Sequence, residues 1–279
     1  MDLMQYGVTH NIEDEVSYRF VAYLIGLLLA FESMLLLACC CVSIIYGERD
    51  LMSFIVSFAV CLSVSAILLV YGRRKKCAMS RNEGYIVVAL SWVFFSVFGM
   101  VPYLWGGFIP NITDAFFETM SGFTTTGATI LDNIESMPHG ILFWRSLTQW
   151  IGGLGIVCFT IVLLPGFGAS SQMLYLSEAT GVTHNKLYPK TRVMARYIFM
   201  VYILLTAIES ALLMAGGMGL FDALCHSMTT TATGGFSTKQ ASIAYWHSPY
   251  IEYVVSLFML LSAINFSLYI VACKSKWKQ

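Results

Sequence analysis

Charged residues are scarce in this chain. Asp, Glu, Lys and Arg make up only 11% of its 279 residues, whereas 57% are hydrophobic and the mean hydropathy is +0.71. About a quarter of the residues in a soluble domain are charged, so the surface of a chain with this composition would not be compatible with water. The shortage of charge excludes a soluble domain and indicates an integral membrane protein of the all-α class.

The sequence also lacks the signals of several other protein classes. Its 16 basic residues equal its 16 acidic ones, which gives no sign of nucleic acid or of an acidic substrate as a partner. The eight cysteines have neither disulfide-framework nor zinc-ligand spacing, and we interpret them as small hydrophobic residues in reduced form. No HExxH motif, CxxC pair or nucleophile elbow occurs. We therefore expect no enzyme, no catalytic or structural metal and no cofactor.

Six apolar runs are long enough to cross a membrane as helices of about 20 residues. They are Phe20–Tyr46, Leu51–Tyr71, Tyr85–Trp105, Ile141–Leu164, Tyr197–Met218 and Tyr250–Cys273. Acidic residues 13–15 precede the first run, where a secretory signal would need basic ones, so we expect that helix to be retained. Two further stretches, 111–130 and 219–237, are crowded with Thr and Gly, and their apolar parts are too short to span.

Basic residues predict how the two short stretches are placed. They cluster at 73–81, 186–196 and 274–278, and each cluster is expected to face the cytoplasm, as are both termini. The chain must cross the membrane an even number of times between clusters, and two clear spans already meet that condition. Each Thr/Gly stretch therefore enters and leaves on the outer side, either as a re-entrant loop or as an ordinary extracytoplasmic loop.

The two Thr/Gly stretches repeat each other. Residues 114–129 read DAFFETMSGFTTTGAT, and residues 222–236 read DALCHSMTTTATGGF, one residue shorter before the glycine. This alignment pairs Gly127 with Gly234. Each stretch follows one span and precedes another, so a unit of helix, half-loop and helix occurs twice.

The composition of each loop indicates a cation as its ligand. Residues 114–122 have the length of a short helix, and residues 124–127 offer no apolar side chain to hydrocarbon. Non-helical backbone at membrane depth is tolerated only where it is buried in protein or lines an aqueous cavity. Glycine lets successive carbonyl oxygens turn toward one axis, where they can replace the hydration shell of a monovalent cation. The short helix would also direct its negative C-terminal end at the ion.

These loops and one later segment resemble a known family. The segments are SGFTTTGAT at 121–129, RSLTQWIGGLGI at 145–156 and TTATGGFST at 230–238. They are similar to those of the Trk/Ktr/HKT potassium transporters, and in particular to the bacterial Trk-type membrane subunit. The resemblance implies uptake of K⁺, by a symporter or channel, through a filter of backbone carbonyls. The filter residues that it implies are Thr125, Thr126, Gly127, Ala232, Thr233 and Gly234.

The same resemblance implies the organisation of the chain. Two leading helices occupy residues 1–80, a first helix, pore-loop, helix repeat occupies 81–185, and a second repeat occupies 186–279. The family's pore has four such repeats, and the third and fourth have no counterpart here. We expect either half of a pore-forming subunit, completed by a missing C-terminal half or a second chain, or a truncated, non-conducting fragment with an assembly or regulatory role.

Four ionisable residues are predicted to lie at or near membrane depth. Arg145 shares a helix face with Gln149, and Glu118 lies on the preceding short helix, within plausible reach. We favour a pair that braces the filter from behind over direct contact with the ion. Glu32 and Glu209 lie in predicted spans, where an ion or proton relay, a polar contact between helices and an interfacial position all remain open.

The resemblance also implies partners and a location. A working assembly would be a homodimer of pores, bound on its cytoplasmic face to an RCK-type nucleotide-binding regulatory subunit. It would lie among the lipids of the bacterial plasma (inner) membrane. The chain shows no nucleotide-binding site of its own.

Overall fold

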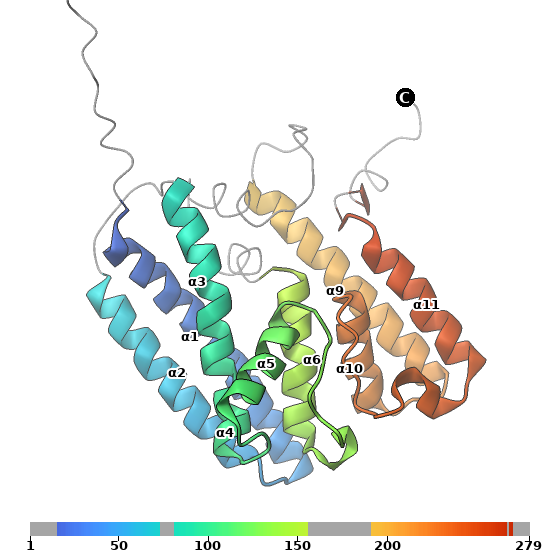
Figure 1. The fold of residues 1–279 in the computed structure, drawn as a ribbon. Helices are drawn as coiled ribbons and strands as arrows, with labels where there is room; N and C mark the ends of the chain where they lie inside the picture. The colour runs from blue at the N-terminus through green and yellow to red at the C-terminus, as the bar shows by residue number, and fades with distance from the viewer. Residues whose placement is uncertain (1–15, 73–80, 156–190, 267, 270–279) are drawn as a thin grey trace, which may run out of the picture.

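A computed structural model describes residues 16–72, 81–155, 191–266, 268 and 269, and within these residues the chain forms helices and no strand. The elements are α1 (Tyr18–Tyr46), α2 (Leu51–Tyr71), α3 (Arg81–Gly99), α4 (Val101–Trp105), α5 (Ile112–Phe123), η2 (Ile134–Ser136), α6 (His139–Gly153), α9 (Thr191–Ala215), α10 (Leu220–Thr231), η3 (Ser242–Trp246) and α11 (Pro249–Ala263). In Figure 1, α5 and α6 lie between the group formed by α1, α2 and α3 and the group formed by α9, α10 and α11.

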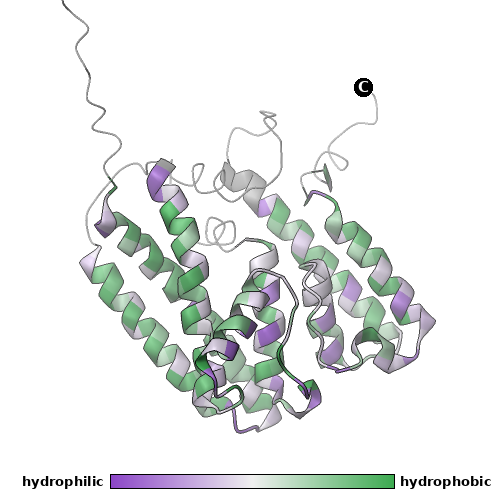
Figure 2. Ribbon diagram, viewed as in Figure 1, coloured by the Kyte–Doolittle hydropathy of each residue, from purple (hydrophilic) through white to green (hydrophobic). Residues whose placement is uncertain are grey.

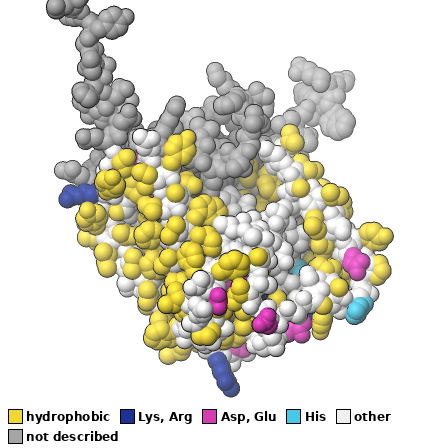
Figure 3. Space-filling model, viewed as in Figure 1, with side chains coloured by type: hydrophobic (Ala, Val, Ile, Leu, Met, Phe, Trp, Pro, Cys, Tyr) yellow, Lys and Arg dark blue, Asp and Glu magenta, His cyan; other side chains and the backbone are white. Residues whose placement is uncertain are grey.

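Four stretches of the described helices are long and apolar enough to cross a membrane. They are Tyr18–Tyr46, Leu51–Tyr71, Asn82–Trp105 and Arg196–Ala215. Green, hydrophobic residues predominate along the outer helices in Figure 2, and hydrophobic side chains cover much of the face seen in Figure 3. Acidic side chains gather toward the lower edge of that face. This distribution suits a chain whose helix flanks contact lipid and whose loops contact water.

Three predicted spans are broken or shortened in the observed helices, whereas those predicted over 20–46 and 197–218 differ from α1 and α9 by a few residues at their ends. The run predicted over 85–105 is interrupted at Met100, because Pro102 in the first turn of α4 has no N–H to continue the helical hydrogen bonds. The run predicted over 141–164 is helical as α6 only to Gly153, and residues from 156 onward lie outside the described part. In the run predicted over 250–273, α11 ends at Ala263, residues 264 and 265 are not helical, and residues 266, 268 and 269 are helical again. Hydrophobicity shows which residues avoid water, but it does not show where helical hydrogen bonding stops.

The two leading helices pack closely against each other. Gly47 ends α1 in the left-handed conformation (φ 65°), which turns the chain back toward α2. The Ser65 hydroxyl on α2 donates to the main-chain oxygen of Gly26 on α1 at 2.7 Å, and a side chain at Gly26 would meet Leu68 at 3.1 Å. Helix α1 also contacts α3 and α6, so the leading pair supports the helices that hold the loops.

The turn between α1 and α2 fixes the start of α6. The Glu48 carboxylate accepts hydrogen bonds from the main-chain N–H of His139 and forms a 2.8 Å contact with His139 Nδ1. The His139 ring stacks on Tyr46, with centroids 3.9 Å apart, and meets the edge of Phe221 at 4.7 Å. Acidic side chains are favourable at a helix N-terminus. The α1–α2 turn, the start of α6 and the start of α10 therefore meet at one end of the bundle.

The order of elements repeats in the part of the chain that is described. A long helix, a short helix, an extended return and a second helix occur as α3 to α6 and again as α9 to α11. The domain limits predicted at 80/81 and 185/186 adjoin or fall within segments 73–80 and 156–190, outside the described residues. Those limits stay predictions.

Candidate ion-binding loops

Both Thr/Gly stretches have the same local structure, a 12-residue helix followed by an extended return. Helix α5 ends at Phe123 and α10 at Thr231. Two residues further on, Thr125 and Thr233 adopt the left-handed conformation, with φ of 53° and 56°. A threonine with positive φ is strained, because its branched side chain crowds the backbone. The same strained turn therefore closes both short helices.

Hydrogen bonds establish the register between the two loops. The N–H of Thr125 donates to Gly122 O at 3.0 Å, as Thr233 donates to Thr230 O at 2.9 Å. The N–H of the next residue in each loop donates to a carbonyl oxygen one position earlier in the helix. Thr126 donates to Ser121 O at 3.0 Å, and Gly234 donates to Thr229 O at 2.8 Å. The loops thus correspond at a constant offset of 108 residues, the difference between Thr125 and Thr233.

This register corrects the alignment made from the sequence. The counterpart of Gly127 (φ 77°) is Gly235 (φ 90°), whereas Gly234 corresponds to Thr126. The second loop is therefore not shorter than the first. Adjacent glycines at 234 and 235 allow a slip of one residue when letters alone are compared, and the positive φ removes that ambiguity.

The offset extends to the side chains behind each loop. In the first unit, Thr129 Oγ1 donates to Glu118 Oε1 at 2.9 Å. At the matching positions of the second unit, His226 Nε2 and Ser237 Oγ are 2.9 Å apart. In the first unit, Glu118 Oε2 also accepts the main-chain N–H of Ile130 at 3.1 Å. A side chain on each short helix therefore holds the returning segment, with an acid in the first unit and a histidine in the second.

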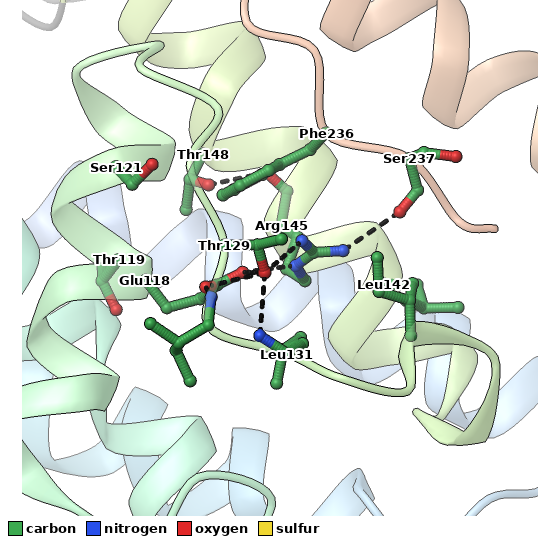
Figure 4. Close-up of polar contacts among 12 residues, drawn as sticks. Glu118, Thr119, Ser121, Thr129, Leu131, Leu142, Arg145, Thr148, Phe236 and Ser237 are labelled. Atoms are coloured by element: carbon green, nitrogen blue, oxygen red, sulfur yellow. Dashed lines mark hydrogen bonds and ion pairs between the residues drawn. The ribbon is translucent and has the colours of Figure 1, made fainter. Parts of the chain in front are cut away.

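Arg145 on α6 connects the two units (Figure 4). Its Nε donates to Glu118 Oε1 at 2.8 Å and its Nη2 to Thr129 Oγ1 at 3.2 Å, both in the first unit. Its Nη1 donates to the main-chain oxygen of Ser237 at 3.0 Å, and its guanidinium carbon lies 4.2 Å from the Phe236 ring centroid, both in the second. Arg145 and Glu118 are buried, at 1% and 0% exposure. The planar guanidinium suits several acceptors held in one geometry.

One helical turn further along α6, Gln149 contacts the second loop. Its Oε1 accepts the main-chain N–H of Phe236 at 3.0 Å. A Cβ added at Gly234 would lie 2.3 Å from Gln149 Cδ, so any larger residue at 234 would clash with this side chain. A Cβ at Gly127 would lie 1.9 Å from the main-chain oxygen of Gly234. The two loops therefore meet backbone to backbone, and glycine permits that approach.

Glycines of α6 bring the ends of both short helices onto one surface. A Cβ at Gly152 would lie 1.8 Å from Phe123 O, at the end of α5. A Cβ at Gly153 would lie 2.7 Å from Ala232 Cα, at the end of α10. Small residues permit close helix contact in membranes. Helix α6 thus positions the C-terminal ends of α5 and α10 side by side.

The six predicted ion-binding residues all lie in these turns, immediately after the short helices. The sequence indicates only part of the set of residues that hold these turns from behind. The Glu118–Arg145 contact follows from the predicted helix positions, but Thr129, Phe236 and Ser237 were not singled out. A repeat comparison at the offset of 108 signals Thr129 and Ser237, since they follow Gly127 and Gly235 by two residues.

A family model described as TrkH, cation transport protein, matches residues 50–278. The Trk system potassium uptake protein TrkH of Salmonella typhimurium is 38% identical over 255 residues, which cover 90% of this chain and 53% of that protein. The TrkH of Halomonas elongata is 36% identical over 263 residues, covering 94% and 55%. The chain spans about half the length of the curated relatives it matches.

A solved structure has the same fold. The crystal structure of the potassium transporter TrkH from Vibrio parahaemolyticus is 35% identical in sequence and gives a TM-score of 0.77, over 92% of this chain and 52% of that one. The all-α membrane fold with pore-loop repeats that was expected from the sequence is confirmed by this likeness.

Proposed function

This chain belongs to the TrkH family of cation transport proteins, and on that premise we propose that its two loops are filter segments for the uptake of potassium across a membrane. The family is one of transporters and not of enzymes. The relatives named above are potassium uptake proteins, which supports K⁺ as the ion. The observation that carries the proposal is the matched pair of strained turns, each followed by a returning segment that is hydrogen-bonded to Arg145.

We propose that the carbonyl oxygens of residues 125, 126, 232 and 233 face the ion and that glycines 127 and 234 allow this arrangement. By the register of the loops, Gly235 joins them as the counterpart of Gly127. Carbonyl oxygens can replace the water molecules around K⁺, provided that the turn holds them in place. The ion pair of Arg145 with Glu118 supplies that support from behind, because it ties both returning segments to α6.

Two filter segments surround an ion on only part of its circumference, so the proposed pore includes further segments. Helix α11 supports this reading. Val255, Met259 and Ala263 occupy the positions on α11 that Arg145, Gln149 and Gly153 occupy on α6, counted from the N-cap residues Ser248 and Pro138. On α6, the residues at these positions contact the second loop, which follows α6 in the chain. On α11 they line a cavity of about 550 Å³ beside the second loop.

We therefore define the complete pore as this chain together with two further loop segments, from the same polypeptide or from the corresponding half of a relative. The proposed assembly is a homodimer with an RCK-type nucleotide-binding subunit on its cytoplasmic face, in the bacterial inner membrane, with both termini in the cytoplasm. The three basic clusters of the sequence support this orientation.

The test replaces Gly127 or Gly235 by Ser in the complete pore. Both residues have positive φ, and a Cβ at Gly127 would also strike Gly234 O, so the carbonyl oxygens of the loop should be displaced. We expect a reduced preference for K⁺ over Na⁺ uptake, with the protein still present in the membrane. The matched control is Gly219→Ser at the N-cap of α10, where φ is −63° and an added Cβ would meet nothing within 4 Å. Unchanged selectivity in both loop variants would contradict the proposal, because the complete pore would then select its ion somewhere other than in these loops.

A further inference from the structure

Glu209 is a buried carboxyl group at the end of the second short helix. It lies on α9, with 0% of its surface exposed, and α9 packs along α10. The Thr231 hydroxyl, in the last residue of α10, donates to Glu209 Oε2 at a long 3.4 Å. Glu209 Oε1 has no hydrogen-bond partner among the residues that the structure describes. The carboxyl group therefore adjoins the turn at Ala232 and Thr233 and is incompletely satisfied.

The charges behind the two loops differ. In the first unit, Glu118 is neutralised by Arg145 at 2.8 Å. In the second unit, His226 occupies the position of Glu118, and Val255 on α11 occupies the helix position of Arg145. Within the described chain, Glu209 forms no salt bridge. The second loop thus has an acidic neighbour without a basic partner.

A negative charge at this place is electrostatically unfavourable when the loop holds no cation. The C-terminal end of α10 already carries a partial negative charge, because the peptide dipoles of the helix are aligned along its axis. A buried carboxylate needs a partner of opposite charge, and ionisable groups inside a membrane commonly mark ion pathways. A cation held by the carbonyl oxygens that follow the end of α10 would be such a partner.

We propose that Glu209 is a positioning residue whose negative charge sets the affinity of the second loop for the transported cation. The carboxylate does not touch the ion. It acts through the end of α10, adding to the negative potential at the carbonyl oxygens of Ala232 and Thr233. This inference rests on the proposed function, because it requires the second loop to hold a cation.

The test measures K⁺ uptake by the complete pore against external K⁺ concentration for Glu209→Gln. Glutamine keeps the shape and can accept the Thr231 hydrogen bond, so the change removes charge and little else. We expect the K⁺ concentration for half-maximal uptake to rise about tenfold, the size expected for a unit charge about 10 Å away at an effective dielectric constant of about 20. The maximal rate per pore in the membrane should change much less.

Two further variants distinguish charge from structure. Glu209→Asp keeps the charge and should restore most of the affinity. Glu32→Gln changes another fully buried carboxyl group, which has no hydrogen-bond partner among the described residues. It lies on α1 beside Gly99 and the α5 residues Thr119 and Phe123, with no contact given to Thr231 or the turn that follows it, so its loss should lower the affinity less than Glu209→Gln does. An unchanged half-saturation in Glu209→Gln overturns the proposal, and so does an equal loss in Glu32→Gln or a loss that only tracks protein abundance.

The glycine variants separate this inference from the proposed function. If Gly127→Ser and Gly235→Ser alter selectivity while Glu209→Gln does not alter affinity, the loops are the filter and only the role of Glu209 is wrong. If the glycine variants also behave as wild type, the loops are not the filter, and both proposals fail.

Discussion

Arg145 Nη1 lies 3.0 Å from the main-chain oxygen of Ser237, although the two residues are 92 positions apart in the sequence. The same guanidinium forms the ion pair with Glu118, so one side chain holds both returning segments. The relative position of the two loops is thus set from α6. A filter made of carbonyl oxygens depends on such a fixed frame, because small displacements change the coordination of the ion.

The first prediction concerns Arg145. Arg145→Ala leaves Glu118 buried without its partner and the oxygen of Ser237 without a donor, and we expect the free energy of unfolding to fall by about 3–5 kcal/mol. Arg145→Lys keeps the charge but loses the planar fork, so an intermediate loss is expected. Denaturant unfolding in detergent measures both. Arg19→Ala, at an exposed arginine on α1, is the control and should change stability little. An Arg145→Ala protein with the free energy of unfolding of the wild type would show that the Arg145–Glu118 ion pair does not stabilise the fold.

The second prediction concerns the close contact between α6 and α5. Gly152→Ser would place a Cβ 1.8 Å from Phe123 O, so the two helices must separate. Overpacking of a well-packed site typically costs about 1–3 kcal/mol, and a backbone neighbour leaves little room to adapt. The melting temperature in detergent should drop, whereas Gly219→Ser should match wild type. Equal melting temperatures for the two variants would mean that α5 and α6 pack less closely than described.

The third prediction is topological. Glu48 contacts His139, and the N–H of Ile134 donates to Gln240 Oε1 at 3.2 Å. The turns around residues 48, 134 and 240 therefore lie at one end of the bundle. Single cysteines introduced near residues 50, 133 and 240 should react with a membrane-impermeant thiol reagent from outside. Cysteines near residues 75, 190 and 276, which lie outside the described part of the chain, should react only from the cytoplasmic side. An outside label near residue 190 would contradict the re-entrant arrangement.

The fourth prediction concerns residues 1–279 expressed with no further loop segments in a bacterium deficient in potassium uptake. Two filter segments leave much of an ion uncoordinated, so growth at low potassium should not be restored. The complete pore is the positive control. Restored growth would oppose the prediction, and crosslinking would then show whether two copies combine their loops into a closed ring.

Several features of this protein could be predicted from its sequence, because they depend on neighbouring residues. The leading helix 51–71 is found at its predicted bounds, and the two Thr/Gly stretches are short helices with extended returns, as expected. Composition and hydrophobic run length determine whether a segment can lie in lipid. The contact of Glu118 with Arg145 also follows from placing each residue on its own helix, since a buried arginine needs an acidic partner.

Other features depend on contacts between distant parts of the chain, and only the tertiary structure decided them. The sequence letters pair Gly127 with Gly234, but hydrogen bonds and positive φ pair it with Gly235. Composition and hydrophobic run length therefore determined that this chain lies in a membrane, and they marked the two Thr/Gly stretches as too short to span it. Packing against α6 decided how those loops meet, because hydrogen bonds across some 90 residues leave no periodic signal in the sequence.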